Sequence, residues 1–245
     1  MKDFYNFIGS LIFIMTLNLD GFSQETVVFK SKDGLEITAD LYQVENSKST
    51  ILLCHQAGYS RGEYINTAKE LNVLGYSCMA IDQRSGNKVN SVINQTNTRA
   101  KAQGLPTNFL DARQDIEVAI DYLYKVNDNK QLIIVGSSYS AALVLLIGKE
   151  NDKDKVKAVA SFSPGEYLKG VDVTNAIANY NKKIFVTSSN KEAEGVTKLV
   201  HKIASGYVTQ YVPSEKGIHG SRALWKTTEG SSGYWKSFKK FLKKQ

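Results

Sequence analysis

The stretch GSSYSAA at positions 136–142 interrupts two apolar runs. QLIIV (131–135) precedes it, and the chain continues as LVLLIG (143–148). A short apolar run, a polar turn and a second apolar run are typical of a buried strand that leads into a helix. The spacing Gly136-x-Ser138-x-Ser140 predicts a nucleophile elbow, a sharp turn that presents Ser138 at the edge of a sheet.

The residues around Ser138 meet the steric demands of such an elbow. Strand and helix crowd the turn, so the positions two before and two after the nucleophile must be small, as Gly136 and Ser140 are. The N–H of Tyr139 begins the predicted helix, where free N–H groups point toward an anion. We therefore expect Tyr139 to donate to an oxyanion.

The rest of the chain alternates strands with helices. A hairpin is predicted over 26–44, with its turn at Lys32–Gly34. Continuous apolar runs predict strands within 49–54, 76–84, 131–138, 156–164, 183–189 and 207–213, and helical spacing predicts helices within 67–77, 111–126, 140–150, 192–203 and 236–244. This order predicts an α/β three-layer sandwich with a mostly parallel central sheet and an N-terminal antiparallel hairpin.

The length of 245 residues fits one domain, and no linker or repeat divides it. The first residues differ from the rest: Lys2 precedes an apolar run at 7–17, which is too short to span a bilayer. Small side chains at Gly21 and Ser23 suit a cut after Ser23. We expect a signal peptide over 1–23, a domain over 24–245, and an exported protein, periplasmic or secreted, with no stable membrane insertion after signal removal. An uncleaved anchor or a buried first helix is the alternative.

The net charge of +7 invites a nucleic-acid interpretation, but the lysines are scattered. The densest basic run, 236–244, carries Phe238, Phe241 and Leu242 at helical spacing, which predicts a docked helix with a solvated basic face. We therefore expect no nucleic-acid partner.

The cysteine and histidine pattern predicts neither a disulfide nor a metal site. Cys54 and Cys78 lie in apolar runs that are predicted to be strands, and neighbouring parallel strands seldom allow disulfide geometry. We expect two buried free thiols. The dispersed cysteines and histidines lack metal-ligand spacing, and no phosphate-binding loop is present, so we expect no metal and no cofactor.

A nucleophilic serine needs a base, and the chain has three histidines: His55, His201 and His219. His201 lies within the helical run 192–203 and is interpreted as structural. His55 ends an early strand. His219 follows the last strand, in Gly-Ile-His-Gly, which fits the chain order Ser, acid, His. We expect His219 to be the base.

The acid that orients this base is predicted among three glutamates. Glu192 directly follows the strand at 183–189 and is the first choice. Glu194 lies two residues further on, and Glu166 follows the preceding strand. Any of these carboxylates could orient and stabilise an imidazolium.

The polar segment 87–109 has no periodic pattern and is predicted to be a long loop. It follows the strand that carries Asp82, so we expect it to wall one side of the substrate site. Asp82 and Arg84, just before it, suggest a structural ion pair.

Several of these motifs together resemble the α/β-hydrolase superfamily, in particular its small uncapped members related to dienelactone hydrolases and serine carboxylesterases. The resemblance rests on HQAGYSRGEY (55–64), AIDQRSG (80–86), DARQDIEVAIDYL (111–123), GSSYSAA (136–142) and IHG (218–220). It departs from the family pattern at Ser140, in place of the last elbow Gly, at Gln56, in place of the Gly after the loop histidine, and in offering glutamates but no Asp as the acid.

The resemblance implies a serine hydrolase that cleaves an ester of a small molecule through an acyl-enzyme. It places the nucleophile on Ser138, the base on His219 and the acid most naturally on Glu192. The oxyanion hole would combine Tyr139 with a second N–H, from Gln56 or Ala57. A peptide or thioester hydrolase with the same triad, or an inactive binding protein on this fold, is the alternative.

Overall fold

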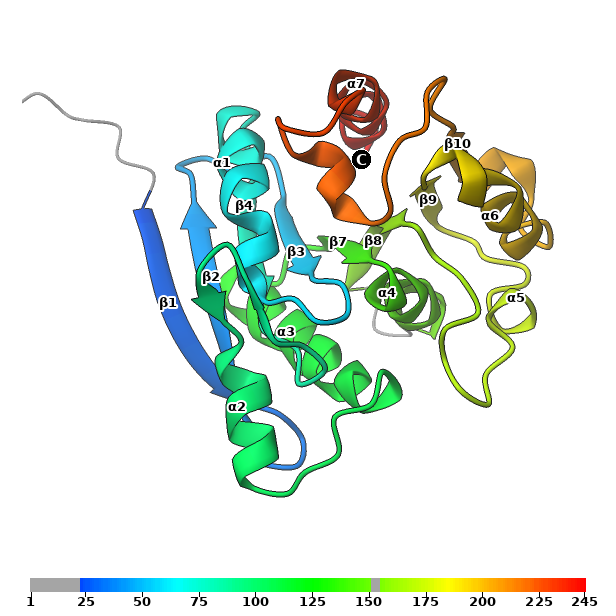
Figure 1. Cartoon of the computed structure of the whole chain (residues 1–245). Helices are drawn as coiled ribbons and strands as arrows, with labels where there is room; N and C mark the ends of the chain where they lie inside the picture. Colours follow the sequence, from blue (N-terminus) through cyan, green and yellow to red (C-terminus); the bar gives the residue numbers. More distant parts are fainter. Residues whose placement is uncertain (1–22, 151–154) are drawn as a thin grey trace, which may run out of the picture.

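The computed structural model describes residues 23–150 and 155–245, and it contains an eight-stranded sheet in the order β1-β2-β4-β3-β7-β8-β9-β10 (Figure 1). The strands are β1 (Ser23–Lys30), β2 (Glu36–Gln43), β3 (Thr50–Cys54), β4 (Ser77–Ile81), β7 (Leu132–Ser137), β8 (Val156–Phe162), β9 (Lys183–Thr187) and β10 (Val208–Tyr211). The predicted signal peptide lies outside the described residues, apart from Ser23.

The sheet is mostly parallel, as predicted. All pairs from β4 through β10 are parallel, whereas β1 pairs with β2, and β2 with β4, in antiparallel fashion. The predicted hairpin turn holds Gly34 at a φ of +86°, a conformation that glycine adopts without steric cost. The carboxyl ends of the parallel strands therefore meet at one edge of the sheet.

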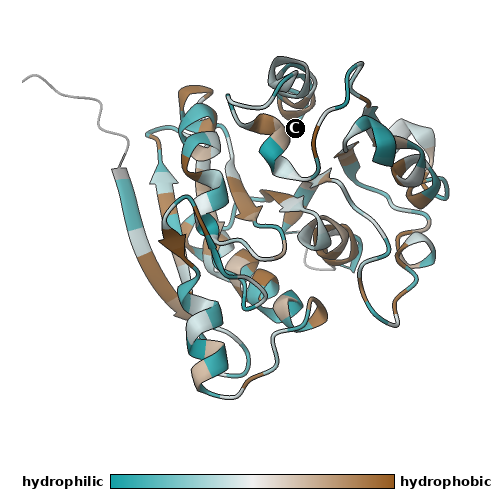
Figure 2. Cartoon of the chain, in the orientation of Figure 1, coloured by the Kyte–Doolittle hydropathy of each residue, from teal (hydrophilic) through white to brown (hydrophobic). Residues whose placement is uncertain are grey.

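Helices cover both faces of the sheet because alternate strand residues are apolar on both sides. One face packs Ile133 and Val135 of β7 against α1 (Ile65–Val73) and α7 (Ser231–Leu242). The other face packs Leu132 and Ile134 against α3 (Arg113–Val126), α4 (Tyr139–Glu150), α5 (Val173–Ala176) and α6 (Ala193–Leu199). Figure 2 shows mostly the hydrophobic colour along β3 and α4, whose residues are nearly all buried.

Cys54 and Cys78 are free and buried, as expected. Although β3 and β4 are neighbours, the two thiols belong to different cores: Cys54 faces α3 and α4, and Cys78 faces α1 and α7. The sheet therefore separates the two sulfur atoms.

The prediction that 87–109 is a structureless loop was wrong. This segment holds the two-residue strands β5 (Lys88–Val89) and β6 (Val92–Ile93) and the helix α2 (Gln95–Ala102). The Asn94 side chain caps α2 by accepting a hydrogen bond from the N–H of Asn97 at 2.7 Å. Helix α2 has little hydrophobic periodicity, so its polar contacts with the rest of the fold stabilise it.

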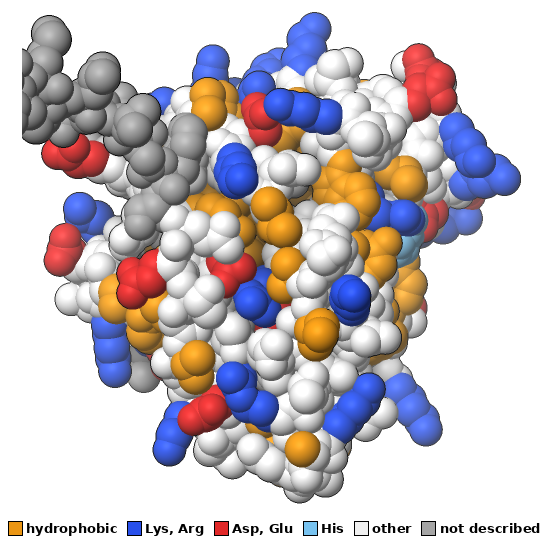
Figure 3. Space-filling model, turned by 60° about the vertical axis from the view of Figure 1, so that its left-hand side comes forward, with side chains coloured by type: hydrophobic (Ala, Val, Ile, Leu, Met, Phe, Trp, Pro, Cys, Tyr) orange, Lys and Arg blue, Asp and Glu red, His pale blue; other side chains and the backbone are white. Residues whose placement is uncertain are grey.

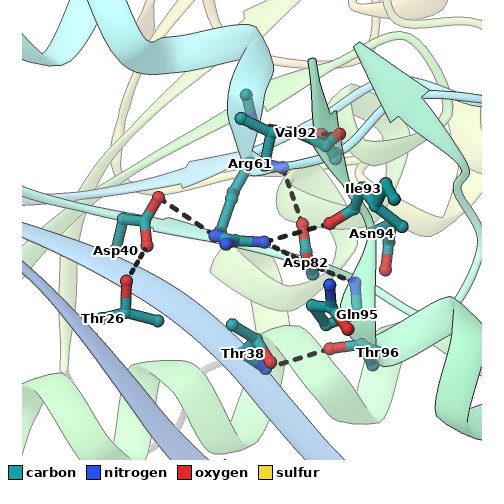
Figure 4. Close-up of polar contacts among 12 residues, drawn as sticks. Thr26, Thr38, Asp40, Arg61, Asp82, Val92, Ile93, Asn94, Gln95 and Thr96 are labelled. Carbon is teal, nitrogen blue, oxygen red and sulfur yellow. Dashed lines mark hydrogen bonds and ion pairs between the residues drawn. The ribbon is translucent and has the colours of Figure 1, made fainter. Parts of the chain in front are cut away.

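The suggested ion pair between Asp82 and Arg84 does not form. Figure 4 shows Arg61 between Asp40 and Asp82, and its guanidinium lies 3.0 and 2.7 Å from the two carboxylates. Asp82 also accepts a hydrogen bond from the N–H of Gln95 at 2.8 Å, which anchors the first turn of α2. The buried Arg84 instead pairs with Asp33, in the hairpin turn, and with Asp115 of α3.

His201 lies just beyond the end of α6 at Leu199, not within a helix as predicted, and it is exposed. Its Nδ1 contacts the carbonyl of Lys198, and no site residue. The structural role that we expected for His201 is therefore limited to this local turn.

Figure 3 shows Lys and Arg side chains spread over one face of the molecule, with hydrophobic side chains between them and no single basic patch on that face. Within 23–150 and 155–245, no helix is long and apolar enough to cross a membrane.

Candidate active site

Ser138 occupies the sharp turn between β7 and α4. Its φ is +58°, a conformation that non-glycine residues seldom adopt, and its N–H donates to the carbonyl of Phe162 at 2.8 Å. A Cβ atom at Gly136 would lie 2.4 Å from the carbonyl oxygen of Ser140, so only glycine fits there. The turn thus has the geometry of the predicted elbow, with a side chain held in a strained backbone conformation.

Ser140, which departs from the family pattern, links the elbow to the loop after β3. Its hydroxyl donates to the carbonyl of His55 at 2.6 Å and accepts a hydrogen bond from Nε2 of Gln83 at 2.5 Å. Glycine could make neither bond. Ser140 is therefore small enough for the elbow and also fixes the neighbouring loop.

Glu192 and His219 lie together at the same edge of the sheet. Nδ1 of His219 is 2.5 Å from Oε1 of Glu192. About a third of each side chain is exposed, 34% for His219 and 32% for Glu192. Glu192 follows β9 and His219 follows β10, and these parallel strands end side by side. The pair therefore joins the predicted base to the first-choice acid.

The second oxygen of Glu192 is held by neighbouring groups. Oε2 accepts hydrogen bonds from the N–H and hydroxyl of Ser189, at 3.1 and 2.7 Å, and from the hydroxyl of Ser163 at 3.0 Å. Burial alone would raise the pKa of Glu192, but the hydrogen bonds from His219 and Ser189 outweigh it and lower that pKa to about 2. Glu192 is therefore ionised throughout the physiological pH range.

The other two candidate acids have different partners. Glu194 pairs with Lys198 on the exposed face of α6. Glu166 caps α5, where its carboxylate accepts hydrogen bonds from the N–H groups of Val173 and Thr174 at 2.7 and 3.0 Å. Neither carboxylate contacts His219, so the geometry singles out Glu192.

Ser138 and His219 both follow strands at this edge, and both side chains are partly exposed. Across the described ranges, no hydrogen bond joins Ser138 Oγ to the imidazole. In unliganded enzymes, catalytic hydrogen bonds are often long or poorly aligned, and they tighten when substrate binds.

His55 organises the loop after β3. Its Nε2 accepts a hydrogen bond from the N–H of Gln83 at 3.1 Å, so Nδ1 carries the proton and donates to the carbonyl of Gln56 at 2.8 Å. Burial lowers the pKa of His55 to about 4. The ring is therefore neutral at pH 7 and acts as a structural tether in this loop.

The structure separates the two candidates for the second oxyanion donor. The N–H of Gln56 donates to Oε2 of Glu63 at 2.8 Å and is therefore already engaged. The N–H of Ala57 has no hydrogen-bond partner among the described residues. Ala57 is thus the residue of the two that can donate to an oxyanion, together with Tyr139 at the start of α4.

Sequence reasoning missed three residues that build this site: Glu63, Gln83 and Ser163. Ser163 follows β8, has a φ of +56°, and accepts a hydrogen bond from the N–H of Gly220 at 2.9 Å while it donates to Glu192. Glu63 and Gln83 lie in the quoted stretches 55–64 and 80–86, but nothing in their spacing assigned them a partner. Their position after strands β3 and β4 was the available signal.

A cavity of about 330 Å³ lies beside the site, between the segment before α3 and the segment after β8. Its lining residues are Ser85, Thr107, Asn108, Phe109, Leu110, Tyr167 and Lys169. Phe109 stacks on Tyr139 with ring centroids 4.4 Å apart, and the Tyr167 ring meets His219 edge-on at 6.4 Å. Two residues that line the cavity, Phe109 and Tyr167, thus contact Tyr139 of the elbow and the imidazole of His219. Of the segment 87–109, residues 107–109 line the cavity.

The sheet order, the elbow after β7 and the acid and histidine after later strands define an α/β-hydrolase fold. Residues 45–212 match the model of the serine aminopeptidase S33 family. The chain belongs to this family. No curated protein matches it in sequence.

Solved structures with the same fold include esterases and a dienelactone hydrolase. The Pyrococcus furiosus esterase Pf2001 is 18% identical, with a TM-score of 0.65 and coverage of 91% of this chain and 93% of that one. Dienelactone hydrolase from Anabaena variabilis is 12% identical, with a TM-score of 0.67 and coverage of 91% and 97%. Est1E from Butyrivibrio proteoclasticus, with ferulic acid bound, is 14% identical, with a TM-score of 0.64 and coverage of 89% and 98%.

Proposed function

We propose that this protein is a serine hydrolase that cleaves carboxylic esters of small molecules through an acyl-enzyme. The observation that carries the proposal is the contact between His219 and Glu192 at the sheet edge where the elbow presents Ser138. Further support is that these three residues, although distant in sequence, all follow strands at one edge of the sheet and occur in the chain order of an α/β-hydrolase triad.

In the first step, Nε2 of His219 accepts the proton of Ser138 Oγ as that oxygen attacks the ester carbonyl. Glu192 keeps Nδ1 of His219 protonated and stabilises the imidazolium that forms. Its low pKa supports this role, because the carboxylate remains charged while the imidazole gains its proton. The imidazolium then protonates the leaving alcohol, and a water molecule releases the acyl group by the reverse sequence.

The N–H groups of Tyr139 and Ala57 stabilise the tetrahedral oxyanion. Tyr139 stands at the first turn of α4, where the helix dipole favours negative charge. The Ala57 N–H has a fixed direction, because the carbonyl of Gln56 on the other side of the same planar peptide is bonded to His55.

The cavity beside Phe109 and Tyr167 is the proposed seat of the acyl group. Its lining is partly aromatic, and one structural relative, Est1E, holds ferulic acid, which is an aromatic acid. Esters of short and aromatic acids are therefore the first substrates to test.

A peptide substrate is the second candidate, because the family model describes serine aminopeptidases. An aminopeptidase needs a carboxylate for the substrate's terminal ammonium. The three glutamates that follow β8 and β9 are otherwise engaged: Glu166 caps α5, Glu192 contacts His219 and Glu194 pairs with Lys198. This favours esters over peptides, and a thioester substrate uses the same chemistry as an ester.

We also propose that the chain is exported. The support is the basic residue and the apolar run in residues 2–17, together with the small residues Gly21 and Ser23. Amino-terminal sequencing of the protein from the periplasmic and extracellular fractions tests this, and an uncut chain confined to the cytoplasm would contradict it.

The activity is tested by intact mass after treatment with a fluorophosphonate, followed by assays with p-nitrophenyl esters and aminoacyl anilides. We expect one adduct on the wild type, no adduct on Ser138→Ala, and a rate of labelling for His219→Ala that is lower by several orders of magnitude. Ser137→Ala keeps the proposed nucleophile and is expected to keep its adduct, formed more slowly because Ser137 Oγ bonds to Glu63.

A well-folded wild type without any adduct would contradict serine catalysis and indicate a binding protein on this fold. Labelling with hydrolysis of anilides but not of esters would identify the aminopeptidase instead.

A further inference from the structure

Glu63 places a carboxylate beneath the proposed site, between three segments that carry the reacting groups. It belongs to the 3-10 helix Arg61–Tyr64 before α1, and only 1% of its surface is exposed. It accepts three hydrogen bonds: from the N–H of Gln56 at 2.8 Å, from Ser137 Oγ at 2.8 Å and from Ser221 Oγ at 2.5 Å.

Each of these three donors is close in sequence to a proposed reacting group. Gln56 directly precedes Ala57, and Ser137 directly precedes Ser138. Ser221 lies two residues after His219. A single side chain therefore contacts the oxyanion loop, the elbow and the histidine loop.

The contacts form a closed network. The N–H of Ser221 donates to Ser137 Oγ at 2.8 Å, so the hydroxyl of Ser137 accepts from the histidine loop and donates its own proton to Glu63. The backbone of Glu63 is held as well, because Nε1 of Trp225 donates to its carbonyl at 2.9 Å. The carboxylate thus has little freedom to move relative to the three segments.

The chemistry of the network calls for a group that accepts hydrogen bonds on both oxygens. Oε2 of Glu63 faces a backbone N–H, and Oε1 faces two hydroxyls. An amide would place a donor at one of these positions. No cation lies within ion-pair distance of Glu63 in the described part of the chain, and burial raises its pKa against the opposing effects of these hydrogen bonds and of the charge on Arg222. A buried carboxyl without a direct ion pair is costly, so it needs an explanation other than stability alone.

We propose that Glu63 is a positioning residue, which fixes the oxyanion loop and the His219 loop relative to Ser138. With His55 on the carbonyl of Gln56 and Glu63 on its N–H, both sides of that residue are held. The direction of the Ala57 N–H follows from this arrangement, because the peptide that joins Gln56 to Ala57 is planar. This proposal rests on the proposed serine-hydrolase function.

The test compares Glu63→Gln with the wild type by kcat and KM for a p-nitrophenyl ester, normalised to active sites titrated with fluorophosphonate. We expect kcat per titrated site to fall about 10- to 100-fold, because a small displacement of an oxyanion donor or base has effects of this size. KM should change less than about threefold, because Glu63 does not contact substrate.

A double-mutant cycle with Ser221→Ala locates the effect. This variant removes one donor to Glu63 and should lower kcat about three- to tenfold. The double variant should be no worse than Glu63→Gln by more than about twofold, because both changes remove the same contact. Losses that simply multiply would mean that the two residues act independently, which contradicts the proposal.

Asn72→Ala is the matched control for stability. Asn72 is also buried, and it bonds the carbonyls of Tyr42 and Tyr76 near the far end of α1. We expect a lower melting temperature but an unchanged kcat per titrated site.

If Glu63→Gln behaves like this control, Glu63 only stabilises the fold and the proposal fails. If the wild type itself gives no adduct with the fluorophosphonate, the proposed function fails. The titration of the wild type therefore separates a failure of the proposed function from a failure of the role proposed for Glu63.

Discussion

His219 and Glu192 are 27 residues apart in the chain, yet Nδ1 of the imidazole lies 2.5 Å from the carboxylate. The parallel pairing of β9 and β10 brings them together, because both residues follow the carboxyl ends of adjacent strands. Ser163, after the neighbouring β8, bonds to Glu192 and to the residue after His219. Residues at three neighbouring strand ends thus define the geometry of this carboxylate–imidazole pair.

Replacing the acid tests this relationship. Glu192→Gln keeps the size of the side chain but removes the charge that holds the imidazole in the correct tautomer. We expect kcat to fall about 10³- to 10⁴-fold with a nearly unchanged KM, as measured by steady-state kinetics on a p-nitrophenyl ester.

Glu166→Gln is the control for this experiment, since Glu166 also accepts several hydrogen bonds but caps α5. We expect it to retain wild-type kcat. A large loss in Glu166→Gln together with an active Glu192→Gln would move the acid to the end of β8.

The elbow should not tolerate a methyl group at Gly136. In Gly136→Ala, the added Cβ would lie 2.4 Å from the carbonyl oxygen of Ser140 and 2.7 Å from Val144 Cγ2. We expect a loss of more than about 2 kcal/mol in the free energy of unfolding and no fluorophosphonate adduct, measured by urea denaturation and intact mass.

Gly195→Ala provides the contrast, because Gly195 lies in α6 with nothing within 4 Å of an added Cβ. This change should stabilise the protein by up to about 1 kcal/mol and leave activity intact. Equal effects of the two substitutions would show that crowding at the elbow is not what requires glycine.

Burial of His55 predicts a pH dependence of stability. Its pKa is about 4 in the folded protein and 6.5 in the unfolded chain, so the unfolded chain binds the extra proton between these values. This contribution is complete above pH 6.5 and is lost as the pH falls toward 4, by on the order of 3 kcal/mol.

The measurement is the free energy of unfolding of the wild type and of His55→Asn across this range. Asn can still donate toward the carbonyl of Gln56 but does not titrate. The difference between the two proteins should shrink as the pH falls from 6.5 to 4, and a constant difference would contradict the neutral, buried state of His55.

Phe109 tests the proposed acyl seat. Its ring lines the cavity and stacks on Tyr139, so Phe109→Ala should enlarge the cavity and shift kcat/KM toward esters with longer or bulkier acyl groups. A series of p-nitrophenyl esters of increasing acyl length measures the shift.

Phe29→Ala is the matched control, since Phe29 stacks on Tyr122 in the same way, with centroids 4.7 Å apart, but does not line the cavity. Its substrate profile should follow the wild type. An unchanged profile in Phe109→Ala would place the acyl group elsewhere.

The sequence was sufficient to predict the alternation of strands and helices, the hairpin at Gly34 and the turn at Ser138. These features depend on local patterns: continuous apolar runs, glycine at a positive φ and small residues on either side of the elbow serine. The chain order also placed His219 last, after the final strand. The segment 87–109 escaped prediction because α2 has little apolar periodicity, and contacts such as Asp82 with Gln95 fix its start.

Only the tertiary structure showed which of Glu192, Glu194 and Glu166 contacts His219, because the direction of each carboxylate depends on its position after β9 or β8 and on its partners. The tertiary structure also showed that the N–H of Gln56 donates to Glu63, seven residues away, whereas the N–H of Ala57 has no partner within residues 23–150 and 155–245. Hydrogen bonds of this kind join residues that the chain keeps apart, and they have no periodic trace in the sequence. The local sequence patterns therefore determined which residues lie at the carboxyl edge of the sheet. The packing of the strands and loops determined which of these residues contact one another.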